Sequence, residues 1–270
     1  MKKILITGAN SYIGESFEKY INENFSGQYE IDTVDMIDGT WREKSFKGYD
    51  AVLHVAGIAH QKETKENSTL YYKVNHEMAV ETAKKAKNEG VKQFIFLSTM
   101  SVYGLTTGII TKDTIPTPNT NYGRSKLEAE KRIGVLADDD FKVCTLRPPM
   151  VYGEGCKGNY QTVVKIVEKF PFFPNVNNRR SMIHVDNLAG FVKMAIDEEL
   201  SGLYFPQNKK YVNTKYLAKH IANRKGKKLY FSFLAGFVVF VFRPFVPMLQ
   251  KAFGNLVYKN TEDFEFKYCK

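Results

Sequence analysis

Cysteine is scarce in this chain of 270 residues, and its scarcity excludes several kinds of protein. The three cysteines, Cys144, Cys156 and Cys269, are odd in number and far apart in the sequence. A disulfide framework needs an even set of cysteines, and zinc sites need pairs of ligands a few residues apart. We therefore expect a reducing compartment, no disulfides and no metal site.

Long apolar runs are also scarce. The start, MKKILITGAN, turns polar before an apolar segment of signal-peptide length can form, so we expect a cytoplasmic protein. Only residues 229–249, LYFSFLAGFVVFVFRPFVPML, could touch a membrane, and Arg243, Pro244 and Pro247 interrupt them. A spanning helix needs about 20 apolar residues. This C-terminal apolar helical segment is therefore predicted to be a buried helix or an interfacial one, and peripheral membrane contact stays open.

Internal repeats and low-complexity tracts are absent, and the composition is that of an ordinary globular protein, with 43% hydrophobic and 25% charged residues. Lys and Arg number 39 against 29 Asp and Glu, a net charge of +10. That sign suits an anionic ligand such as a nucleotide, an acidic membrane surface or nucleic acid, although most of these side chains would simply be solvated. No basic stripe interleaved with aromatic residues is present, so we expect no nucleic-acid partner.

Strand-like and helix-like segments alternate through the first half of the chain. The predicted strands are 2–7, 29–34, 51–55, 91–97 and 141–146, and the predicted helices are 12–24, 70–88 and 121–136. Such alternation implies parallel crossovers and an α/β fold with a Rossmann-type doubly wound parallel sheet. The interval between Asp35 and Ala51 is too short for another strand and helix, so the sheet should be trimmed there.

After residue 150 the alternation weakens, and helical patterns recur at 160–170, 185–196 and 214–223. We expect residues 1–150 to form a dinucleotide-binding domain and residues 151–270 a smaller substrate-binding region over the carboxyl edge of the sheet. Ligands of open α/β sheets bind at that edge.

The segment TGANSYIG places Gly8 and Gly14 six residues apart between a strand and a helix. Gly8 permits a tight turn, Gly14 permits close packing, and the helix N-terminus attracts a pyrophosphate. Asp35 ends the second strand, where a carboxylate would bond an adenosine ribose and repel a 2′-phosphate. These features favour NAD over NADP, and the alternative is a structural turn with a solvated aspartate.

Tyr122 and Lys126 lie four residues apart in YGRSK, on one face of a predicted helix. An ammonium beside a phenol lowers the pKa of the phenol, which could then act as a base near neutral pH. Taken alone, such a pair is more often an exposed helix face. The stretch STMSVYG, residues 98–104, adds hydroxyl groups at the end of a strand.

Together these motifs resemble the extended short-chain dehydrogenase/reductase superfamily, in its branch of nucleotide-sugar epimerases and dehydratases. The resemblance covers residues 2 to about 202, and further segments carry it: HVAG at 54–57, VN at 74–75, FIFLSTMSVYG at 94–104, LRPPMVYG at 146–153 and RSMIHVDNL at 180–188.

The resemblance implies roles for individual residues. Thr99 would bond the reacting sugar oxygen, Tyr122 would be the acid/base, Lys126 would hold the nicotinamide ribose, and Asn75 would order the active-site helix. The implied cofactor-binding residues are Gly8, Asn10, Ser11, Tyr12, Ile13, Gly14, Asp35, Ala56, Gly57, Tyr122, Lys126 and Pro148. The implied substrate-binding residues are Thr99, Met100, Asn159 and Arg180, with Arg179 as an alternative to Arg180. Ser11 departs from the pattern, because a glycine is usual there.

The resemblance also bears on the reaction. Related 4,6-dehydratases carry an Asp-Glu pair directly after the hydroxyl residue, where this chain has Met100 and Ser101, so a dehydratase is disfavoured. We favour an NAD-dependent C4 epimerase of a UDP-hexose or UDP-N-acetylhexosamine that serves surface-polysaccharide synthesis. The alternatives are an NAD(P)H-dependent 4-keto reductase and a non-catalytic dinucleotide-binding or membrane-peripheral protein. A homodimer is left open.

Overall fold

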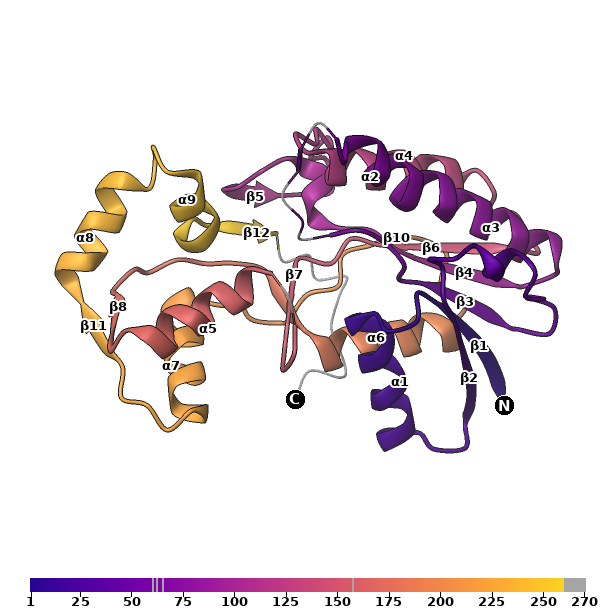
Figure 1. The fold of residues 1–270 in the computed structure, drawn as a ribbon, viewed down its shortest axis with the longest axis horizontal. Coiled ribbons are helices and arrows are strands. Elements are labelled where there is room, and N and C mark those ends of the chain that lie inside the picture. The colour runs from indigo at the N-terminus through magenta and orange to yellow at the C-terminus, as the bar shows by residue number, and fades with distance from the viewer. Residues whose placement is uncertain (60, 62, 65, 157, 260–270) are drawn as a thin grey trace.

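A six-stranded parallel sheet forms the centre of the protein (Figure 1). The computed structural model describes residues 1–59, 61, 63–64, 66–156 and 158–259, so Cys269 lies outside it. The strands of the sheet are, in spatial order, β10 (Gly202–Tyr204), β6 (Lys142–Leu146), β4 (Gln93–Leu97), β3 (Ala51–His54), β1 (Lys2–Thr7) and β2 (Tyr29–Val34). All neighbours pair in parallel, which confirms the predicted fold class.

The sheet is trimmed at β2, as the sequence predicts. In the described part of the chain no strand lies beyond β2, and the short 3-10 helix η1 (Thr40–Arg42) occupies the interval before β3. The connection from β2 to β3 therefore crosses back without a helix of full length.

Helices cover both faces of the sheet (Figure 1). On one face lie α1 (Tyr12–Asn24) and α6 (Val185–Asp197), which pack on Ile4 and Ile6. On the other, around Leu5, the elements are α2 (Ser68–Tyr72), the π-helical η2 (Lys73–Met78), α3 (Ala79–Asn88) and α4 (Asn121–Gly134). Alternate residues of β1 thus face opposite layers, as the strand period of two requires. The helix predicted at 70–88 is interrupted by η2.

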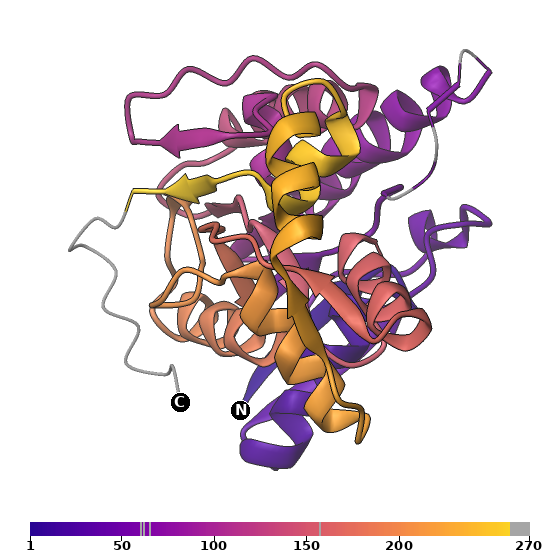
Figure 2. The ribbon, with the colours of Figure 1, turned by 90° about the vertical axis from the view of Figure 1, so that its left-hand side faces the viewer.

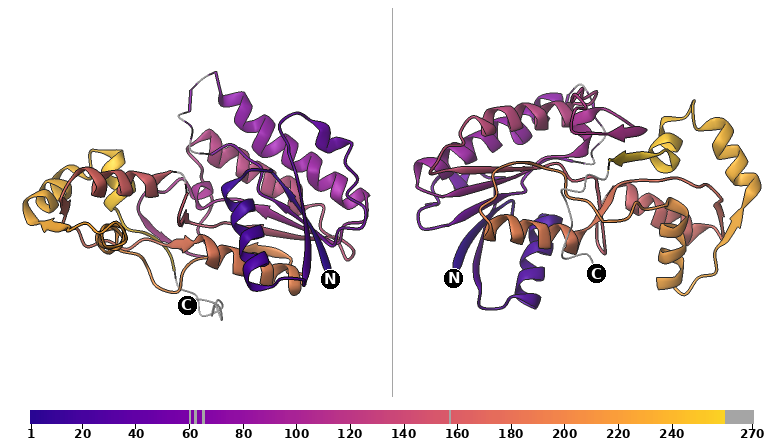
Figure 3. Two further views of the ribbon diagram at one scale, coloured as in Figure 1. Left: turned by 60° about the horizontal axis from the view of Figure 1, so that its bottom comes forward. Right: turned by 180° about the vertical axis from the view of Figure 1, so that it is seen from behind.

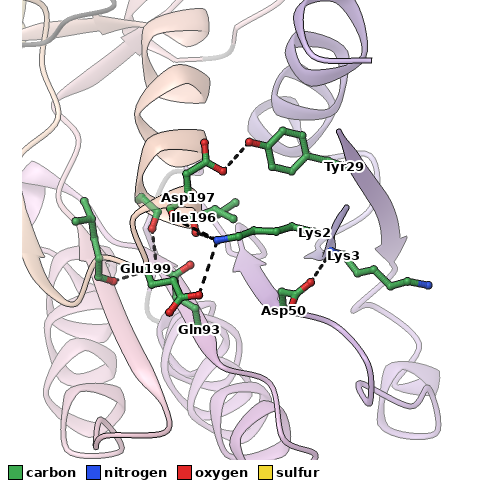
Figure 4. Close-up of polar contacts among 10 residues, drawn as sticks. Lys2, Lys3, Tyr29, Asp50, Gln93, Ile196, Asp197 and Glu199 are labelled. Carbon is green, nitrogen blue, oxygen red and sulfur yellow. Dashed lines mark hydrogen bonds and ion pairs between the residues drawn. The ribbon is translucent and has the colours of Figure 1, made fainter. Parts of the chain in front are cut away.

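Polar contacts fasten α6 to the amino end of the sheet (Figure 4). The Lys2 ammonium donates to the Ile196 carbonyl at 2.6 Å, and the Gln93 amide donates to the carbonyls of Ala195 and Leu200 at 2.8 and 3.0 Å. Tyr29 donates its hydroxyl to Asp197 at 2.6 Å. These bonds lie at the end of the sheet opposite the glycine turn.

The remaining elements form a lobe beyond the carboxyl edge of the sheet (Figures 1 and 3). Its helices are α5 (Asn159–Lys169), α7 (Thr214–Arg224), α8 (Phe233–Phe242) and α9 (Pro247–Phe253). Three short parallel pairs join distant segments: β7 (Met150–Tyr152) with β9 (Met182–His184), β8 (Phe172–Pro174) with β11 (Tyr230–Ser232), and β5 (Gly108–Ile110) with β12 (Leu256–Tyr258). Because β10 and α6 follow residue 150 and yet join the sheet layer, the division at residue 150 stays a prediction.

The apolar stretch 229–249 folds as β11, α8 and the start of α9. Most of the α8 side chains are exposed, so the expectation of a buried helix is wrong and that of an interfacial segment stays open. Among the described residues, no helix combines the length and the apolar character needed to cross a membrane.

Candidate active site

The turn after β1 joins three parts of the chain at the carboxyl edge of the sheet. Gly8 has a φ of 109°, and the N–H groups of Gly8 and Ala9 donate to the Val34 carbonyl at 2.9 and 3.1 Å. A Cβ on Gly8 would lie 2.9 Å from the backbone of Ala56, which is closer than real Cβ atoms come. Glycine is therefore required here, both for its φ and for the close approach.

Helix α1 begins directly after this turn and points its N-terminus at the edge. Ser11 is the N-cap, and its hydroxyl accepts the Gly14 N–H at 3.2 Å. A Cβ on Gly14 would lie 2.7 Å from that hydroxyl. The serine that departs from the family pattern thus has a capping role, and Gly14 is what lets the cap close. Exposed Asn10 takes a φ of 62° to make the bend.

The side chains of Tyr12 and Ile13 pack on different parts of the structure: Tyr12 packs on the apolar cluster of the lobe and Ile13 on the core of the sheet. The Tyr12 hydroxyl lies 2.7 Å from the position that a Cβ on Gly153 would take, and Ile13 packs on the core beneath α1. The first N–H groups of α1 have no partner within the helix and so could contact a cofactor.

We call the turn at Gly8 and the N-terminus of α1, together with Asp35 and Gly57, the glycine cradle. Asp35 and Gly57 come from the ends of β2 and β3. One Asp35 carboxylate oxygen accepts the Ile37 N–H at 2.8 Å, directly after the strand that bonds the glycine turn. A Cβ on Gly57 would meet the Asn75 side chain at 2.9 Å and the Lys126 ammonium at 3.3 Å. A glycine turn under a helix N-terminus, flanked by a carboxylate, fits a dinucleotide such as NAD.

Thr99, Tyr122 and Lys126 come together from two elements. Thr99 follows β4, caps the 3-10 helix η3 (Met100–Tyr103) and accepts the Ser101 N–H at 3.1 Å. The Thr99 hydroxyl lies near enough to Tyr122, in the first turn of α4, to lower the pKa of that phenol. Lys126, one turn further on and buried, donates to the Leu97 carbonyl at 2.8 Å and lies 4.7 Å above the Phe96 ring.

Burial controls the ionisation of both groups of the pair. It lowers the pKa of Lys126 to about 8, although Glu130 acts in the opposite direction. It raises the pKa of Tyr122, and the nearby Thr99 hydroxyl lowers it by a smaller amount. The sequence predicted a lowered phenol pKa because it shows the lysine but not the loss of solvent, and burial is the larger effect here.

The predicted substrate-side residues are less closely gathered. Met100 is buried and donates its N–H to the carbonyl of Pro148 at 2.9 Å, so these two lie beside Thr99. Asn159 begins α5, and its side chain lies outside the described part of the structure. Arg180 donates to the Gly254 carbonyl at 2.9 Å, and burial lowers its pKa to about 10.

The side chains of Arg179 and Arg180 point to opposite sides, because neighbouring residues of an extended chain alternate. Arg179 is exposed and lines a pocket of about 730 Å³ together with Lys209 and Lys210. The backbone of both arginines lies against β12: the Arg179 carbonyl accepts the Leu256 N–H at 3.1 Å, and Arg180 forms an isolated bridge with Leu256. The predicted alternative between the two side chains stays a prediction.

Sequence comparison decides the family. The profile described as the NAD dependent epimerase/dehydratase family matches residues 4–205. The chain belongs to this family. It is similar to a UDP-glucose 4-epimerase of Vibrio cholerae, with 32% identity over 73% of this chain and 67% of the relative. It is also 25% identical to the N-acetyl-alpha-D-glucosaminyl-diphospho-ditrans,octacis-undecaprenol 4-epimerase of Escherichia coli O157:H7, over 84% of this chain and 73% of the relative.

Solved structures show the same fold. A UDP-glucuronic acid 4-epimerase from Bacillus cereus in complex with NAD has a TM-score of 0.72 and 17% identity, covering 96% of this chain and 90% of that one. A dTDP-4-dehydrorhamnose reductase from Clostridium acetobutylicum has a TM-score of 0.70 and 23% identity, covering 85% and 82%. Membership of the epimerase/dehydratase family makes this chain an NAD-dependent enzyme of nucleotide sugars.

Asn75 and Glu63 make side-chain hydrogen bonds to the region around α4. Buried Asn75 accepts the Ile58 N–H at 2.8 Å and donates to the Ser125 hydroxyl of α4 at 3.3 Å; its role in ordering that helix stays a prediction. Glu63 accepts the N–H groups of Asn121 and Tyr122 at 2.9 and 3.0 Å. Sequence reasoning missed Glu63, because nothing local shows that its loop returns to α4.

A buried ion pair under the site was also missed. Arg147 and Glu130 approach to 2.5 Å with both side chains largely buried, and Glu130 accepts a hydrogen bond from Ser98. Arg147 also donates to the Tyr103 hydroxyl at 2.8 Å. The signal was present in the sequence, since Glu130 lies one turn after Lys126 and Arg147 stands in LRPP. This network ties α4 to the segment on which Thr99 lies.

Proposed function

We propose that this chain is a C4 epimerase of a UDP-hexose or UDP-N-acetylhexosamine. One observation carries the proposal: Thr99 and Tyr122 lie close together beside the glycine cradle, while Met100 and Ser101 occupy the positions where a dehydratase has carboxylates. The chain thus holds the groups for proton exchange at one sugar hydroxyl. It lacks, at those two positions, the acid and base that loss of water would need.

The proton chemistry follows from the geometry. NAD, when bound, supplies the hydride acceptor and donor for C4. Tyr122, as phenolate, takes the proton of the C4 hydroxyl and later returns it to the carbonyl oxygen of the 4-keto sugar. The Thr99 hydroxyl, whose oxygen already accepts the Ser101 N–H, directs its own hydrogen toward the reacting oxygens.

Lys126 supports this exchange by its charge. Its ammonium sits next to the point where a Cβ on Gly57 would lie, at the cradle, and it favours the phenolate form of Tyr122 when protonated. In the proposed assignment Gly8, Asn10, Ser11, Tyr12, Ile13, Gly14, Asp35, Ala56, Gly57 and Pro148 bind NAD. Met100, Asn159 and Arg180 bind the sugar nucleotide, with the Arg180 fork on the diphosphate.

A second candidate substrate is a sugar diphosphate carried by a polyprenol. The relative from Escherichia coli O157:H7 is named for such a substrate. The observation that favours this substrate is the apolar surface of α8, where Phe233, Phe237 and Phe240 are all more than half exposed. A lipid-linked sugar lies at a membrane surface, and only an enzyme that reaches this surface can use it.

Direct turnover distinguishes these activities. Purified protein should be incubated with NAD and UDP-glucose, UDP-galactose or their N-acetyl forms, and in parallel with polyprenyl diphospho-N-acetylglucosamine in detergent. Interconversion of one C4 pair is expected, detected by chromatography of the released sugars. No interconversion of any pair, combined with NADH- or NADPH-dependent loss of a 4-keto sugar nucleotide, would instead identify a reductase.

A further inference from the structure

Helix α8 presents an apolar surface that the rest of the described chain leaves uncovered. Only Gly236 and Val239 of this helix are buried, and a Cβ on Gly236 would lie 2.7 Å from the Asn175 carbonyl oxygen. The exposed fractions of the other large side chains are 80% at Phe233, 75% at Leu234, 63% at Phe237, 46% at Val238, 67% at Phe240, 40% at Val241 and 52% at Phe242.

The surface continues past the helix. Phe245 and Met248, in the turn and the first residues of α9, are 80% and 68% exposed. Figure 2, seen from the side of the lobe, shows α8 and β11 in front, with no other part of the drawn chain over α8. We call the nine side chains from Phe233 to Met248 the apolar surface. Patches of this kind on a protein surface mark contact with a partner or a membrane.

In the sequence, the charges on either side of the apolar surface are all of one sign, although Glu168 of α5 pairs with Lys225 at 2.5 Å. Residues 201–259 contain 11 Lys and Arg and no Asp or Glu, so this stretch carries a net charge of +11. The whole chain carries +10, so the other residues together carry −1 (10 minus 11). Exposed Lys227 and Lys228 precede β11, and exposed Lys251 follows in α9. Positive charge beside exposed phenylalanine is complementary to an anionic lipid surface.

The length of α8 and the charge of the lobe narrow the choice of partner. Ten residues of helix span about 15 Å, half of the about 30 Å of a bilayer core, so α8 can lie in the interface but cannot cross it. A second copy of the chain on the same surface would bring together two lobes that carry positive charge and no carboxylates between 201 and 259. Such a pairing is opposed by like charge.

We propose that the apolar surface docks this enzyme on an anionic phospholipid bilayer, with the phenylalanines in the boundary of the acyl chains and the lysines at the headgroups. Docking would hold the lobe at the membrane and leave the sheet, at the other end of the molecule in Figure 1, in water. The inference goes beyond the proposed function and does not depend on which sugar is converted.

Vesicle co-sedimentation of the full chain tests it. Vesicles of phosphatidylcholine with about one third phosphatidylglycerol should bind the protein, and pure phosphatidylcholine vesicles should bind it at least about fivefold more weakly. Rising salt should weaken binding further, because screening acts on the charged part. The variant with Phe233→Ser, Phe237→Ser and Phe240→Ser should lose at least about tenfold in affinity.

Matched controls separate docking from general stickiness. Ile115 and Val135 are exposed to 77% and 78%, and the variant with Ile115→Ser and Val135→Ser should bind like wild type. Lys228→Gln with Lys251→Gln should weaken binding without touching an apolar side chain, which keeps the test valid if the triple variant folds poorly. Failure of the wild type to bind anionic vesicles would overturn the proposal. Equal binding by wild type and the triple variant would overturn it too. So would a wild-type dimer in solution that becomes monomeric in the triple variant.

Discussion

Helices α4 and α8 reverse the usual relation between composition and burial. The sequence of α4, NYGRSKLEAEKRIG, is mostly polar, yet it buries Ser125, Lys126 and Glu130. The sequence of α8, FLAGFVVFVF, is apolar throughout, yet it buries only Gly236 and Val239. Burial is therefore set by what the fold places around a helix, not by the helix itself.

The surroundings of the two helices explain this difference. Around α4 the chain supplies a partner for each buried polar group, because Leu97 accepts from Lys126 and Arg147 pairs with Glu130. Around α8 it supplies one capping bond, from the Ala235 N–H to the Ser232 hydroxyl at 3.1 Å, and a contact with Asn175. Buried polar groups are costly unless they are paired, so α4 is built for positioning. The outer face of α8 is left for a contact outside the chain.

The largest expected effect is on turnover. Tyr122→Phe removes the hydroxyl that exchanges the proton and should lower kcat about 10²- to 10⁴-fold, while NAD remains bound. Epimerisation assays with mass spectrometry of the retained cofactor measure both. Tyr230→Phe, at a tyrosine exposed in β11, should leave kcat unchanged. Full activity of Tyr122→Phe would show that α4 does not carry the acid/base.

The buried ion pair on α4 should matter most for stability. Arg147→Met leaves Glu130 buried without its counter-charge and should lower the free energy of unfolding by about 3 to 5 kcal/mol. Arg42→Met breaks the exposed pair with Glu81, whose side chains are about half exposed, and should cost at most about 1 kcal/mol. Urea unfolding compares the two. Equal losses would mean that the network under α4 is as solvated as a surface pair.

Lys126 makes stability depend on pH. Its pKa is lowered from 10.5 to about 8 on folding, so the unfolded chain holds the proton between these values while the native chain has lost it. Stability therefore rises with pH across that window, by about 3 kcal/mol for this group, and the cost of burying the charge is fully present below it. Lys126→Met should remove this rise in urea unfolding measured from pH 7 to 10.5. Lys131→Met, at an exposed lysine of the same helix, should keep this rise of stability with pH. If Lys126→Met keeps the rise as well, folding does not lower the pKa of Lys126.

Much of the framework of α4 could be predicted from the sequence. The bounds of β1, α1 and β2 agree with the prediction to the residue, because periodic apolar residues end at glycine or polar residues there. The spacing of Tyr122 and Lys126 placed both on one helix face near a hydroxyl that ends a strand. Such features are local, and a helix or strand period makes them visible.

Contacts between distant segments could not be predicted. Glu63 reaches α4 from a loop 58 residues away in sequence, and the raised pKa of Tyr122 depends on burial that only the folded chain creates. The strands of three residues in the C-terminal lobe carry too few residues for a period. For α8 the sequence shows apolar residues but not that the lobe leaves them uncovered.

Removing the carboxylate cap of α4 should have a smaller effect. Glu63→Ala leaves the N–H groups of Asn121 and Tyr122 without their acceptor and should lower the free energy of unfolding by about 1 kcal/mol. Because the freed turn carries Tyr122, kcat should fall as well, with little change in KM for NAD. Glu128→Ala, at an exposed position of the same helix, should change neither. An unchanged kcat would limit Glu63 to a structural role.

The smallest expected effect is the one that tests α8 most sharply. Phe237→Ser replaces a side chain that is 63% exposed and should change the free energy of unfolding by less than about 0.5 kcal/mol. Val239→Ala, two residues along the helix at 6% exposure, should cost about 2 kcal/mol, because it deletes buried methyl groups and leaves a cavity. Urea unfolding in buffer without lipid measures both. A loss at Phe237 as large as that at Val239 would mean that the outer face of α8 is covered in solution, and the contrast with α4 would then disappear.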